Sequence, residues 1–396
     1  MKDRSLHVLV VDDSAVVRQV LRDLLASEPG LSVSVAGDPV IAEKKIRSRR
    51  PDVIILDLEL PIMDGLTWLR QRMAEDPIPV IVCSARVGEA ASVTIQALEE
   101  GAVEVVPKPQ LGVRDFLVES RDPLLRAIRA AAGARVRRRG RARSAPRRRS
   151  RTDPASRPAG VDRSVTRSRE PGPRVDRPPR AQAAAIAPRA IGGARSTTPP
   201  RVIAMGASTG GPQALQALLT PLPACMPGIV VVQHMSAAFL PAFARRLDEQ
   251  CALHVREAVA GDRVEPGTVL IAPGGAHLEL RPGQGGADYG VVLHQEPAVE
   301  GHRPSVDVLF RSVARVAGAG AFGLLLTGMG RDGAAGLLEM RQAGGATLVE
   351  SRESCVVFGM PGAALELGAA EEALALDELA LRIHDWGYRA EAAADG

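Results

Sequence analysis

The sequence predicts an α/β protein with two doubly wound, mainly parallel sheets that are joined by a disordered Arg/Pro-rich linker. Short apolar runs alternate with stretches of 3.6-residue periodicity in residues 6–131 and again in residues 201–396. Many runs of the second region are apolar throughout, as in strands that are buried on both faces of a sheet. Between these regions, residues 135–195 hold 19 Arg, eight Pro and no aromatic residue. Such a segment cannot bury enough apolar surface to fold.

The composition of the whole chain excludes several classes of protein. Its 396 residues suggest two or three domains. No apolar run approaches the ~18 residues of a membrane-spanning helix. The N-terminal apolar run ends in two acids rather than in a cleavage site, so we expect no signal peptide. The four cysteines form no close pair, which argues against a disulfide framework or a zinc site. We therefore expect a reduced, cytoplasmic protein.

The net charge of +4 is distributed unevenly along the chain. Residues 1–134 carry a net charge of −3, residues 135–195 carry +15 and residues 196–396 carry −8. The basic linker could contact nucleic acid, anionic lipid or an acidic partner, or it could be a solvated tether extended by self-repulsion. We favour the tether, because 46 Arg against 4 Lys in the whole chain indicates a general preference for Arg. Neither acidic region is an obvious nucleic-acid domain.

In the first region, polar side chains stand where the predicted strands end. We expect those strands at 6–11, 31–36, 52–57, 78–85 and 103–109. In a doubly wound sheet, functional groups gather at the carboxyl ends of the strands. Asp12 and Asp13 follow the first strand, and Asp57 ends the third. Ser84 and Lys108 end the fourth and fifth.

These strand-end residues suit phosphoryl transfer to a carboxylate. The acidic trio of Asp12, Asp13 and Asp57 would repel one another, and Mg²⁺, which prefers carboxylate oxygens and water, would resolve that repulsion. Asp57 is the expected nucleophile and would form an aspartyl-phosphate. Mg²⁺ and Lys108 would neutralise the phosphate charge. A single Asp at a strand end is more often a helix cap, so the prediction depends on all five residues together.

The first region resembles the receiver domains of two-component response regulators. Four stretches carry the resemblance: V-V-D-D-S (10–14), I-L-D-L-E-L-P-I-M-D-G (55–65), C-S-A (83–85) and V-P-K-P (106–109). The resemblance implies a flavodoxin-like fold in which Asp57 accepts phosphate from a histidine kinase. It also implies that Asp13 and Asp57 bind Mg²⁺, with Asp12 helping through water, and that Ser84 and Lys108 sense the phosphate.

The second region places a serine, a histidine and an aspartate at the ends of predicted strands. We expect strands at 201–207, 228–233, 268–273, 291–295, 322–328 and 346–350. M-G-A-S-T-G-G-P (205–212) presents Ser208, V-V-Q-H-M (231–235) presents His234, and L-T-G-M-G-R-D-G (326–333) presents Asp332. These three side chains make a catalytic-triad hypothesis, with backbone N–H groups of the Gly-rich loops as an oxyanion hole.

Two alternatives remain open for the glycine-rich turn at Ser208. Such a turn often binds phosphate, although this one has neither the Lys of a P-loop nor a G-x-G-x-x-G pattern. The stretch also fits the G-x-S-x-G elbow of α/β-hydrolases. That fold places its histidine last, which would require His384 in a predicted terminal helix. The order Ser208, His234, Asp332 instead argues for a different fold.

The second region resembles the catalytic domain of the chemotaxis protein-glutamate methylesterases. Besides the three motifs above, the matching stretches are G-H-R-P-S-V-D-V-L-F (301–310) and S-C-V-V-F-G-M-P (354–361). The resemblance implies a Rossmann-like three-layer domain with Ser208 as nucleophile, His234 as general base and Asp332 as its orienting partner. It further implies that the N–H of Met329 contributes to the oxyanion hole and that Thr209 tunes the His234 contact.

The two resemblances together imply an architecture and an activity. We expect a receiver domain over 1–134, a linker over 135–198 and a catalytic domain over 199–396. The implied reaction is phosphorylation-activated hydrolysis of glutamate methyl esters on chemoreceptors, with methanol release and deamidation of receptor glutamine. Mg²⁺ would serve the receiver, and the esterase would need no cofactor. The implied partners are a chemotaxis histidine kinase and methyl-accepting chemoreceptors, with no nucleic acid and no membrane insertion.

Two alternative functions remain at this stage. The same hydrolase could act on a partner outside chemotaxis. The receiver could instead have a binding output through the Arg-rich linker, although no helix-turn-helix pattern or aromatic platform supports that. The sequence leaves open which receptor is served, the balance of esterase and deamidase activity, and the oligomeric state.

Overall fold

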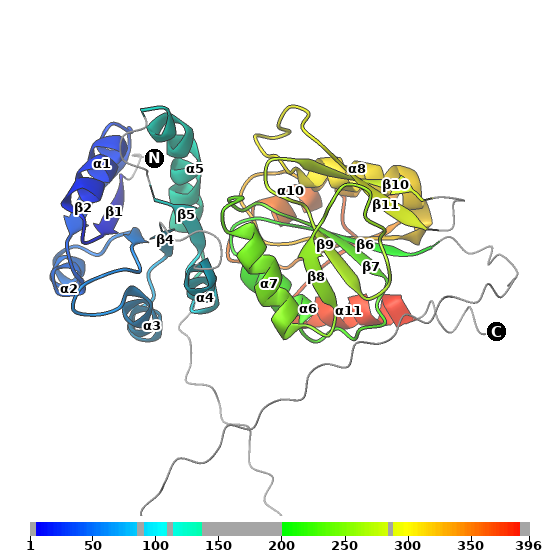
Figure 1. Ribbon diagram of the computed structural model, residues 1–396, viewed down its shortest axis with the longest axis horizontal. Helices are drawn as coiled ribbons and strands as arrows, with labels where there is room; N and C mark the ends of the chain where they lie inside the picture. Colours follow the sequence, from blue (N-terminus) through cyan, green and yellow to red (C-terminus); the bar gives the residue numbers. More distant parts are fainter. Residues whose placement is uncertain (1–4, 85–90, 109–113, 137–199, 284–287, 389–396) are drawn as a thin grey trace, which may run out of the picture. The chain divides into compact units, whose positions relative to one another are not determined.

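The computed structural model describes residues 5–84, 91–108, 114–136, 200–283 and 288–388 (Figure 1). These residues form two parallel sheets and a separate antiparallel hairpin. Residues 5–136 hold the N-terminal sheet and residues 200–388 hold the C-terminal sheet. Almost all of the predicted linker lies outside the described residues, so its disorder and the bounds of the three predicted segments stay predictions.

The N-terminal sheet has the strand order β2-β1-β3-β4-β5, and all its pairs are parallel. Its strands are β1 (Leu6–Val11), β2 (Leu31–Ala36), β3 (Val53–Leu56), β4 (Val80–Ser84) and β5 (Glu104–Pro107). All five predicted strands are therefore present. The strand order reverses direction at β1, and Val11 of β1 pairs with Leu56 of β3. This register places Asp12 and Asp57 next to each other, just beyond the paired strand ends.

Five helices cover the two faces of this sheet: α1 (Ala15–Ala26), α2 (Pro39–Ser48), α3 (Gly65–Glu75), α4 (Ser92–Glu99) and α5 (Arg114–Ala132). Side chains of Ser14, Asp38 and Asp64 accept hydrogen bonds from backbone N–H groups at the starts of α1, α2 and α3. Alternate residues of the strands point to opposite faces. One set packs against α1 and α5, and the other packs against α2, α3 and α4.

The C-terminal sheet has the order β14-β13-β12-β6-β7-β9-β8 and is parallel throughout. Its strands are β6 (Val202–Ala207), β7 (Gly228–Gln233), β8 (His254–Glu257), β9 (Thr268–Ile271), β12 (Ala321–Leu325), β13 (Ala346–Glu350) and β14 (Glu372–Leu374). β10 (His277–Pro282) and β11 (Tyr289–His294) form the antiparallel hairpin. The predicted strand at 291–295 thus belongs to this hairpin. The strands β8, β10 and β14 were not predicted.

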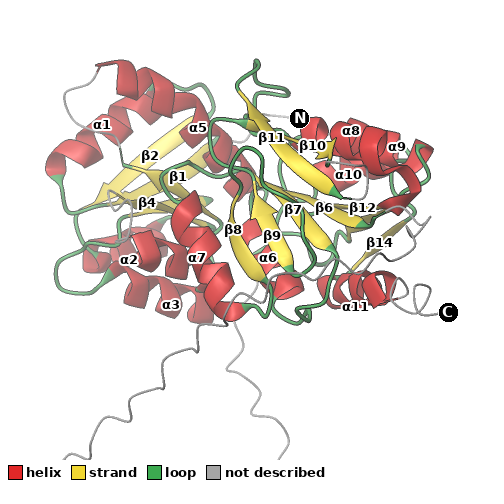
Figure 2. Ribbon diagram, turned by 45° about the vertical axis from the view of Figure 1, so that its right-hand side comes forward, coloured by secondary structure: helices red, strands yellow, loops and turns green. Residues whose placement is uncertain are grey.

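The helices of the C-terminal sheet lie in two layers (Figure 2). They are α6 (Gly211–Leu219), α7 (Leu240–Gln250), α8 (Val306–Ala317), α9 (Ala334–Gln342), α10 (Met360–Glu366) and α11 (Leu376–Tyr388), with a 3-10 turn at Gly318–Gly320. α6, α7 and α11 pack on one face, and α8, α9 and α10 pack on the other. This is the predicted three-layer α/β arrangement, and it leaves the carboxyl ends of the strands free to carry polar groups.

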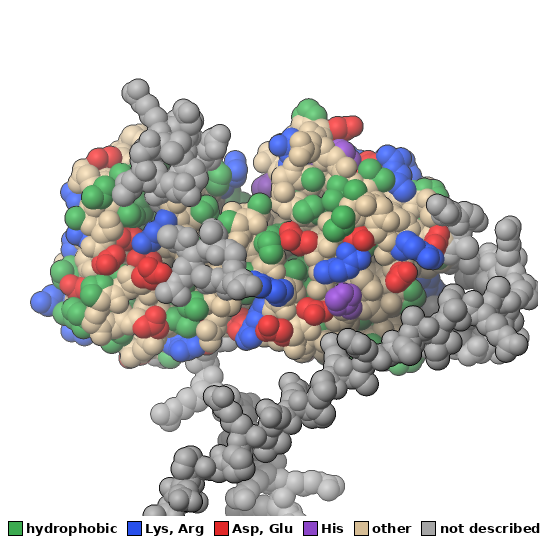
Figure 3. Space-filling view, in the orientation of Figure 1, with side chains coloured by type: hydrophobic (Ala, Val, Ile, Leu, Met, Phe, Trp, Pro, Cys, Tyr) green, Lys and Arg blue, Asp and Glu red, His purple; other side chains and the backbone are tan. Residues whose placement is uncertain are grey.

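The surface of the described residues is mixed in charge. Figure 3 shows acidic and basic side chains interspersed over the face that it draws. Among the described helices, none has the length and apolar character needed to cross a membrane.

Candidate active site and phosphorylation site

The acidic trio forms a compact cluster at the carboxyl end of the N-terminal sheet. Oxygen atoms of Asp12, Asp13 and Asp57 lie within 4.8 Å of one another, with Asp12 and Asp57 buried and Asp13 exposed. The Lys108 Nζ lies 2.7 Å from the Oδ2 of Asp57 and 3.0 Å from the Oδ2 of Asp12. Ser84 is buried at the end of β4, where it pairs with Pro107, the residue before Lys108. The structure therefore brings all five predicted residues to one end of the sheet.

The charges of this cluster depend on one another. Burial raises the pKa of the Asp57 carboxyl, and the hydrogen bond and charge of Lys108 only partly offset this effect. Burial alone would lower the pKa of Lys108, but its bonds to Asp57 and its attraction to Asp12 outweigh burial and raise that pKa. Lys108 is thus held as a cation beside the buried carboxylates. Two buried carboxylates and one exposed carboxylate, with oxygens this close together, are a donor set that fits Mg²⁺.

The glycine-rich turn after β6 presents Ser208. Gly210 has a φ of +79°, a left-handed conformation at the start of α6 that glycine adopts without strain. A Cβ on Gly211 would lie 2.1 Å from the Oε1 of Gln233, so this position also needs glycine. The side-chain amide of Gln233 donates to the carbonyl of Ser208 (2.9 Å), and the N–H of Ser208 donates to the carbonyl of Thr327 (3.0 Å). These bonds fix the backbone of a serine that is only 7% exposed.

His234 and Asp332 are joined by a buried hydrogen bond. The Nε2 of His234 lies 2.9 Å from the Oδ2 of Asp332. Asp332 also accepts hydrogen bonds from the Ser305 hydroxyl (2.7 Å) and from the N–H groups of Val306 (2.8 Å) and Asp307 (3.0 Å). The two N–H groups belong to the first turn of α8, where the helix dipole favours an anion.

Asp332 is an anion despite its burial. Burial alone would raise the pKa of the Asp332 carboxyl, but the hydrogen bonds and charge of His234, together with those of Ser305 and Asp307, lower it. A carboxylate in this position can hold an imidazole in one orientation and stabilise the charge that the ring gains when it takes a proton. His384, the alternative histidine, lies on α11, where its ring contacts Tyr388.

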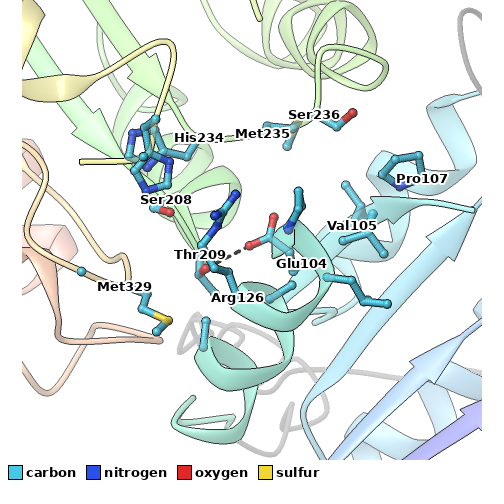
Figure 4. A pocket seen from close by; sticks show the side chains of 18 of the residues that line it. Glu104, Val105, Pro107, Arg126, Ser208, Thr209, His234, Met235, Ser236 and Met329 are labelled. Atoms are coloured by element: carbon cyan, nitrogen blue, oxygen red, sulfur yellow. Dashed lines mark hydrogen bonds between the residues drawn. The ribbon is translucent and has the colours of Figure 1, made fainter. Parts of the chain in front are cut away.

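The two nitrogens of His234 have distinct surroundings. Because Nε2 faces Asp332, Nδ1 is the nitrogen left for the nucleophile, and it is buried with no hydrogen-bond partner among the described residues. Figure 4 shows the side chains of Ser208 and His234 beside each other at one end of a cavity. In the chymotrypsin arrangement Nδ1 faces the aspartate and Nε2 faces the serine. The roles of the two nitrogens are therefore exchanged here.

The loop after β12 carries Met329, the predicted oxyanion donor. The N–H of Thr327 donates to the buried Glu350 carboxylate (2.9 Å), and the N–H of Gly328 donates to the carbonyl of Val357 (3.0 Å). In the described structure, the N–H of Met329 makes no hydrogen bond, and its side chain lines the same cavity as Ser208. A fixed loop with one free N–H near the nucleophile is suited to bind a developing oxyanion.

Sequence reasoning did not identify His302 and Glu104 as site residues. The His302 ring stacks on His234, with centroids 3.8 Å apart and planes 2° from parallel. Burial and the charge of His234 lower the pKa of His302 to about 4. Glu104, the first residue of β5, accepts a hydrogen bond of 3.0 Å from the hydroxyl of Thr209. Thr209 thus bonds to Glu104, and its predicted influence on the His234 contact stays a prediction. His302 lies within a recognised motif, but nothing near Glu104 signalled its position.

Polar contacts also join α4 of the N-terminal sheet to α6 and α7 of the C-terminal sheet. The Arg246 guanidinium binds both oxygens of Glu99, with Nε at 2.7 Å and a terminal nitrogen at 2.9 Å. Gln250 donates to the same carboxylate (2.8 Å). Gln213 donates to the carbonyl of Ala102 (2.6 Å). The described residues of both sheets belong to one compact unit.

The fold and the two clusters define a class of protein: a response regulator whose output domain is an α/β hydrolase with Ser, His and Asp at its strand ends. The family model for the response regulator receiver domain matches residues 8–116, and the family model for CheB methylesterase matches residues 203–383. The chain belongs to the protein-glutamate methylesterase/protein-glutamine glutaminase family, and it is a receiver-linked methylesterase.

Relatives support this assignment over nearly the whole chain. The protein-glutamate methylesterase/protein-glutamine glutaminase 2 of Xanthomonas campestris pv. campestris is 47% identical over 377 residues, which cover 95% of this chain and 99% of that protein. The protein of the same name from Rhodospirillum rubrum is 46% identical over 389 residues, covering 98% and 99%. The crystal structure of the Thermotoga maritima CheB methylesterase catalytic domain is 37% identical, with a TM-score of 0.46, and covers 47% of this chain and 98% of that one.

These comparisons confirm the predicted family, fold class and enzyme class, and they do not favour a binding output through the linker. Below, residues 5–136 are called the receiver and residues 200–388 the esterase. The roles of individual residues stay predictions.

Proposed function

We propose that this protein hydrolyses the γ-methyl esters of glutamate residues on methyl-accepting chemoreceptors and deamidates receptor glutamine, and that phosphorylation of Asp57 by a chemotaxis histidine kinase activates it. The observation that carries the proposal is the hydrogen bond from His234 to Asp332, with His234 and Ser208 lining the same cavity. The names of the relatives supply the substrate class. We predict that the protein acts in the cytoplasm, where it would meet both the histidine kinase and the chemoreceptors.

The esterase residues perform acyl transfer in two steps. The Ser208 oxygen attacks the ester carbonyl while its proton moves to Nδ1 of His234, and Asp332 stabilises the imidazolium. The N–H of Met329 binds the oxyanion. The imidazolium then returns its proton to the leaving methoxide, and methanol departs. Water next attacks the acyl-enzyme, with His234 again taking the proton, to release glutamate and Ser208. None of these steps calls for a cofactor.

The receiver residues serve phosphorylation. Asp57 would attack the phosphoryl group, and the acidic trio would hold Mg²⁺, with Asp12 acting through water. Bound Mg²⁺ would neutralise charge on the phosphoryl oxygens. Lys108 is already paired with Asp57 at 2.7 Å, so a phosphoryl group on Asp57 would bring the Lys108 ammonium to the phosphate. Ser84, at the end of β4, would supply a hydroxyl to the same group.

We further propose that the receiver restrains the esterase until Asp57 is phosphorylated. Glu104 and Lys108 lie at the start of β5 and directly after its end, so one short strand joins the contact with Thr209 to the phosphorylation cluster. A change in the position of Lys108 would be transmitted along β5 to Glu104. Separation of the receiver from the esterase would give a receptor helix access to Ser208. Because the linker is long, we expect weak inhibition.

Methanol release from methylated receptor tests the proposal. Wild-type protein supplied with a small-molecule phosphodonor should release methanol, and Ser208→Ala should release none. Asp57→Asn should show only the basal rate. If wild-type protein released no methanol, the substrate assignment would be wrong. If the donor stimulated Asp57→Asn as fully as wild type, the assignment of the phosphorylation site would be wrong.

A further inference from the structure

A cavity of about 610 Å³ remains at Ser208 and His234 while the receiver contacts the esterase. This volume falls within the ~300–1,000 Å³ typical of small-molecule sites. The space at Ser208 is therefore large enough for a small ester even with the receiver in contact.

The cavity has apolar walls and a reactive end (Figure 4). Apolar side chains from both the receiver and the esterase line it: Val105, Leu124, Ala127, Met235, Pro304 and Met329. Ser208 and His234 line it too. A short aliphatic chain could therefore lie along the wall with its ester group at Ser208.

Arg126 gives this cavity a positive charge. It lies on α5 of the receiver, lines the cavity, and forms no ion pair or hydrogen bond among the described residues. Its charge acts on His302, whose pKa it helps to lower. An arginine without a partner, facing a reactive site from the opposite wall, is suited to bind a carboxylate.

The other charged groups of the lining do not cancel Arg126. Glu104 is bonded to Thr209, and its burial raises its pKa to about 7, so it is only a partial anion near neutral pH. Glu300 is exposed, and it is matched by Arg303, which is also exposed and donates to the carbonyls of Gln295 and Glu296. With Glu104 partly protonated and Glu300 offset by Arg303, the remaining charge of the lining is that of the exposed Arg126, which favours an anion.

We propose that the unphosphorylated enzyme hydrolyses small monoesters of dicarboxylic acids in this cavity, with Arg126 binding the free carboxylate and Ser208 attacking the ester. This inference rests on the proposed function for the roles of Ser208 and His234. One water is consumed for each ester, and the products are methanol, a second carboxylate and a proton. Phosphorylation would thus control access by protein substrates and not the competence of the triad.

Methanol release from monomethyl glutarate by the full chain, without phosphodonor, tests the inference. Dimethyl glutarate is the neutral comparison with the same carbon chain. We expect turnover of both esters with a higher kcat/KM for the charged one, and no turnover by Ser208→Ala. Arg126→Gln should lower kcat/KM for monomethyl glutarate about tenfold, the loss of one charge-assisted hydrogen bond, and leave dimethyl glutarate unchanged.

Arg129→Gln is the matched control, because Arg129 lies on the same helix and pairs with Glu28 instead of lining the cavity. It should behave as wild type. If the full chain cleaved small esters only after phosphodonor was added, the receiver would close the cavity and the inference would be wrong. Equal effects of Arg126→Gln on both esters would overturn the role of Arg126. A protein that demethylates receptor but cleaves no small ester refutes this inference alone, and the reverse result refutes only the receptor as substrate.

Discussion

The hydroxyl of Thr209, the residue after the proposed nucleophile, donates a 3.0 Å hydrogen bond to the Glu104 carboxylate at the start of β5. Burial raises the pKa of Glu104 to about 7, against the opposing effect of the bonds from Thr209 and from the Val105 N–H. The stability of the contact between receiver and esterase therefore depends on whether Glu104 is protonated. In the open state, where Glu104 meets water, its pKa would return to ~4.3.

We predict that basal activity depends on pH through Glu104. The pKa of Glu104 is raised in the closed state, so the protonated acid stabilises that state. This stabilisation is complete below about pH 4. It decreases as pH rises towards 7 and does not change further above that pH. Basal methanol release, divided by the rate of the phosphorylated enzyme to remove the titration of the triad, should rise over this window. Glu104→Gln should flatten the ratio. An unchanged pH dependence in Glu104→Gln would disprove the linkage.

A second prediction concerns the pair of Glu99 and Arg246. Arg246→Glu replaces a bidentate ion pair between helices α4 and α7 by a repulsion between two carboxylates. The receiver should therefore separate from the esterase more often in the unphosphorylated enzyme. Because the pair is partly exposed, we expect the free energy of opening to fall by about 1 kcal/mol. This corresponds to roughly a fivefold rise in basal receptor demethylation. The reversed pair, Glu99→Arg with Arg246→Glu, should return the rate towards wild type. Failure of the reversed pair to do so would mean that Arg246 acts elsewhere.

The third prediction concerns the phosphorylation cluster. Lys108→Met removes the cation that pairs with Asp57 and Asp12 and leaves the carboxylates in place. The variant should still acquire phosphate from a donor, measured by intact-protein mass, but its esterase should be stimulated far less than wild type, because the phosphate can no longer attract Lys108. Normal stimulation of a phosphorylated Lys108→Met variant would contradict the proposed route along β5.

The fourth prediction separates catalysis from folding at Asp332. Asp332→Asn should lower kcat by about 10⁴-fold, because an amide cannot both orient His234 and stabilise its charge. It should also lower the melting temperature, since its NH₂ group would face the N–H donors of α8. Ser305→Ala removes only one of the bonds to Asp332 and serves as the comparison, with a small loss of both quantities. A wild-type kcat in Asp332→Asn would exclude its role.

The sequence predicted the parts of both sites that follow from strand topology. Asp12 and Asp57 could be placed together because the ends of neighbouring parallel strands meet, and the register of Val11 with Leu56 shows this directly. The contact of Glu104 with Thr209 could not be predicted. It joins residues 105 positions apart, across surfaces whose pairing leaves no periodic pattern in either sequence.

Short or exposed elements were also missed, for physical reasons. β14 has three residues, two of them exposed, so it lacks an apolar run. The stacking of His302 on His234 depends on the path of a loop, which local periodicity does not specify. The effect of the α8 dipole on Asp332 depends on the tertiary contact between α8 and the loop after β12, which local sequence does not specify.

The exchanged nitrogens of His234 have a consequence for the resting enzyme. With Nε2–H directed at Asp332 and Nδ1 bare, the ring is the tautomer that free histidine already prefers in water. A hydrolase of the chymotrypsin arrangement must instead enforce the less favoured Nδ1–H form through its aspartate. In this protein the solution preference of imidazole and the field of Asp332 act in the same direction, so nitrogen NMR should place the proton of the uncharged ring on Nε2.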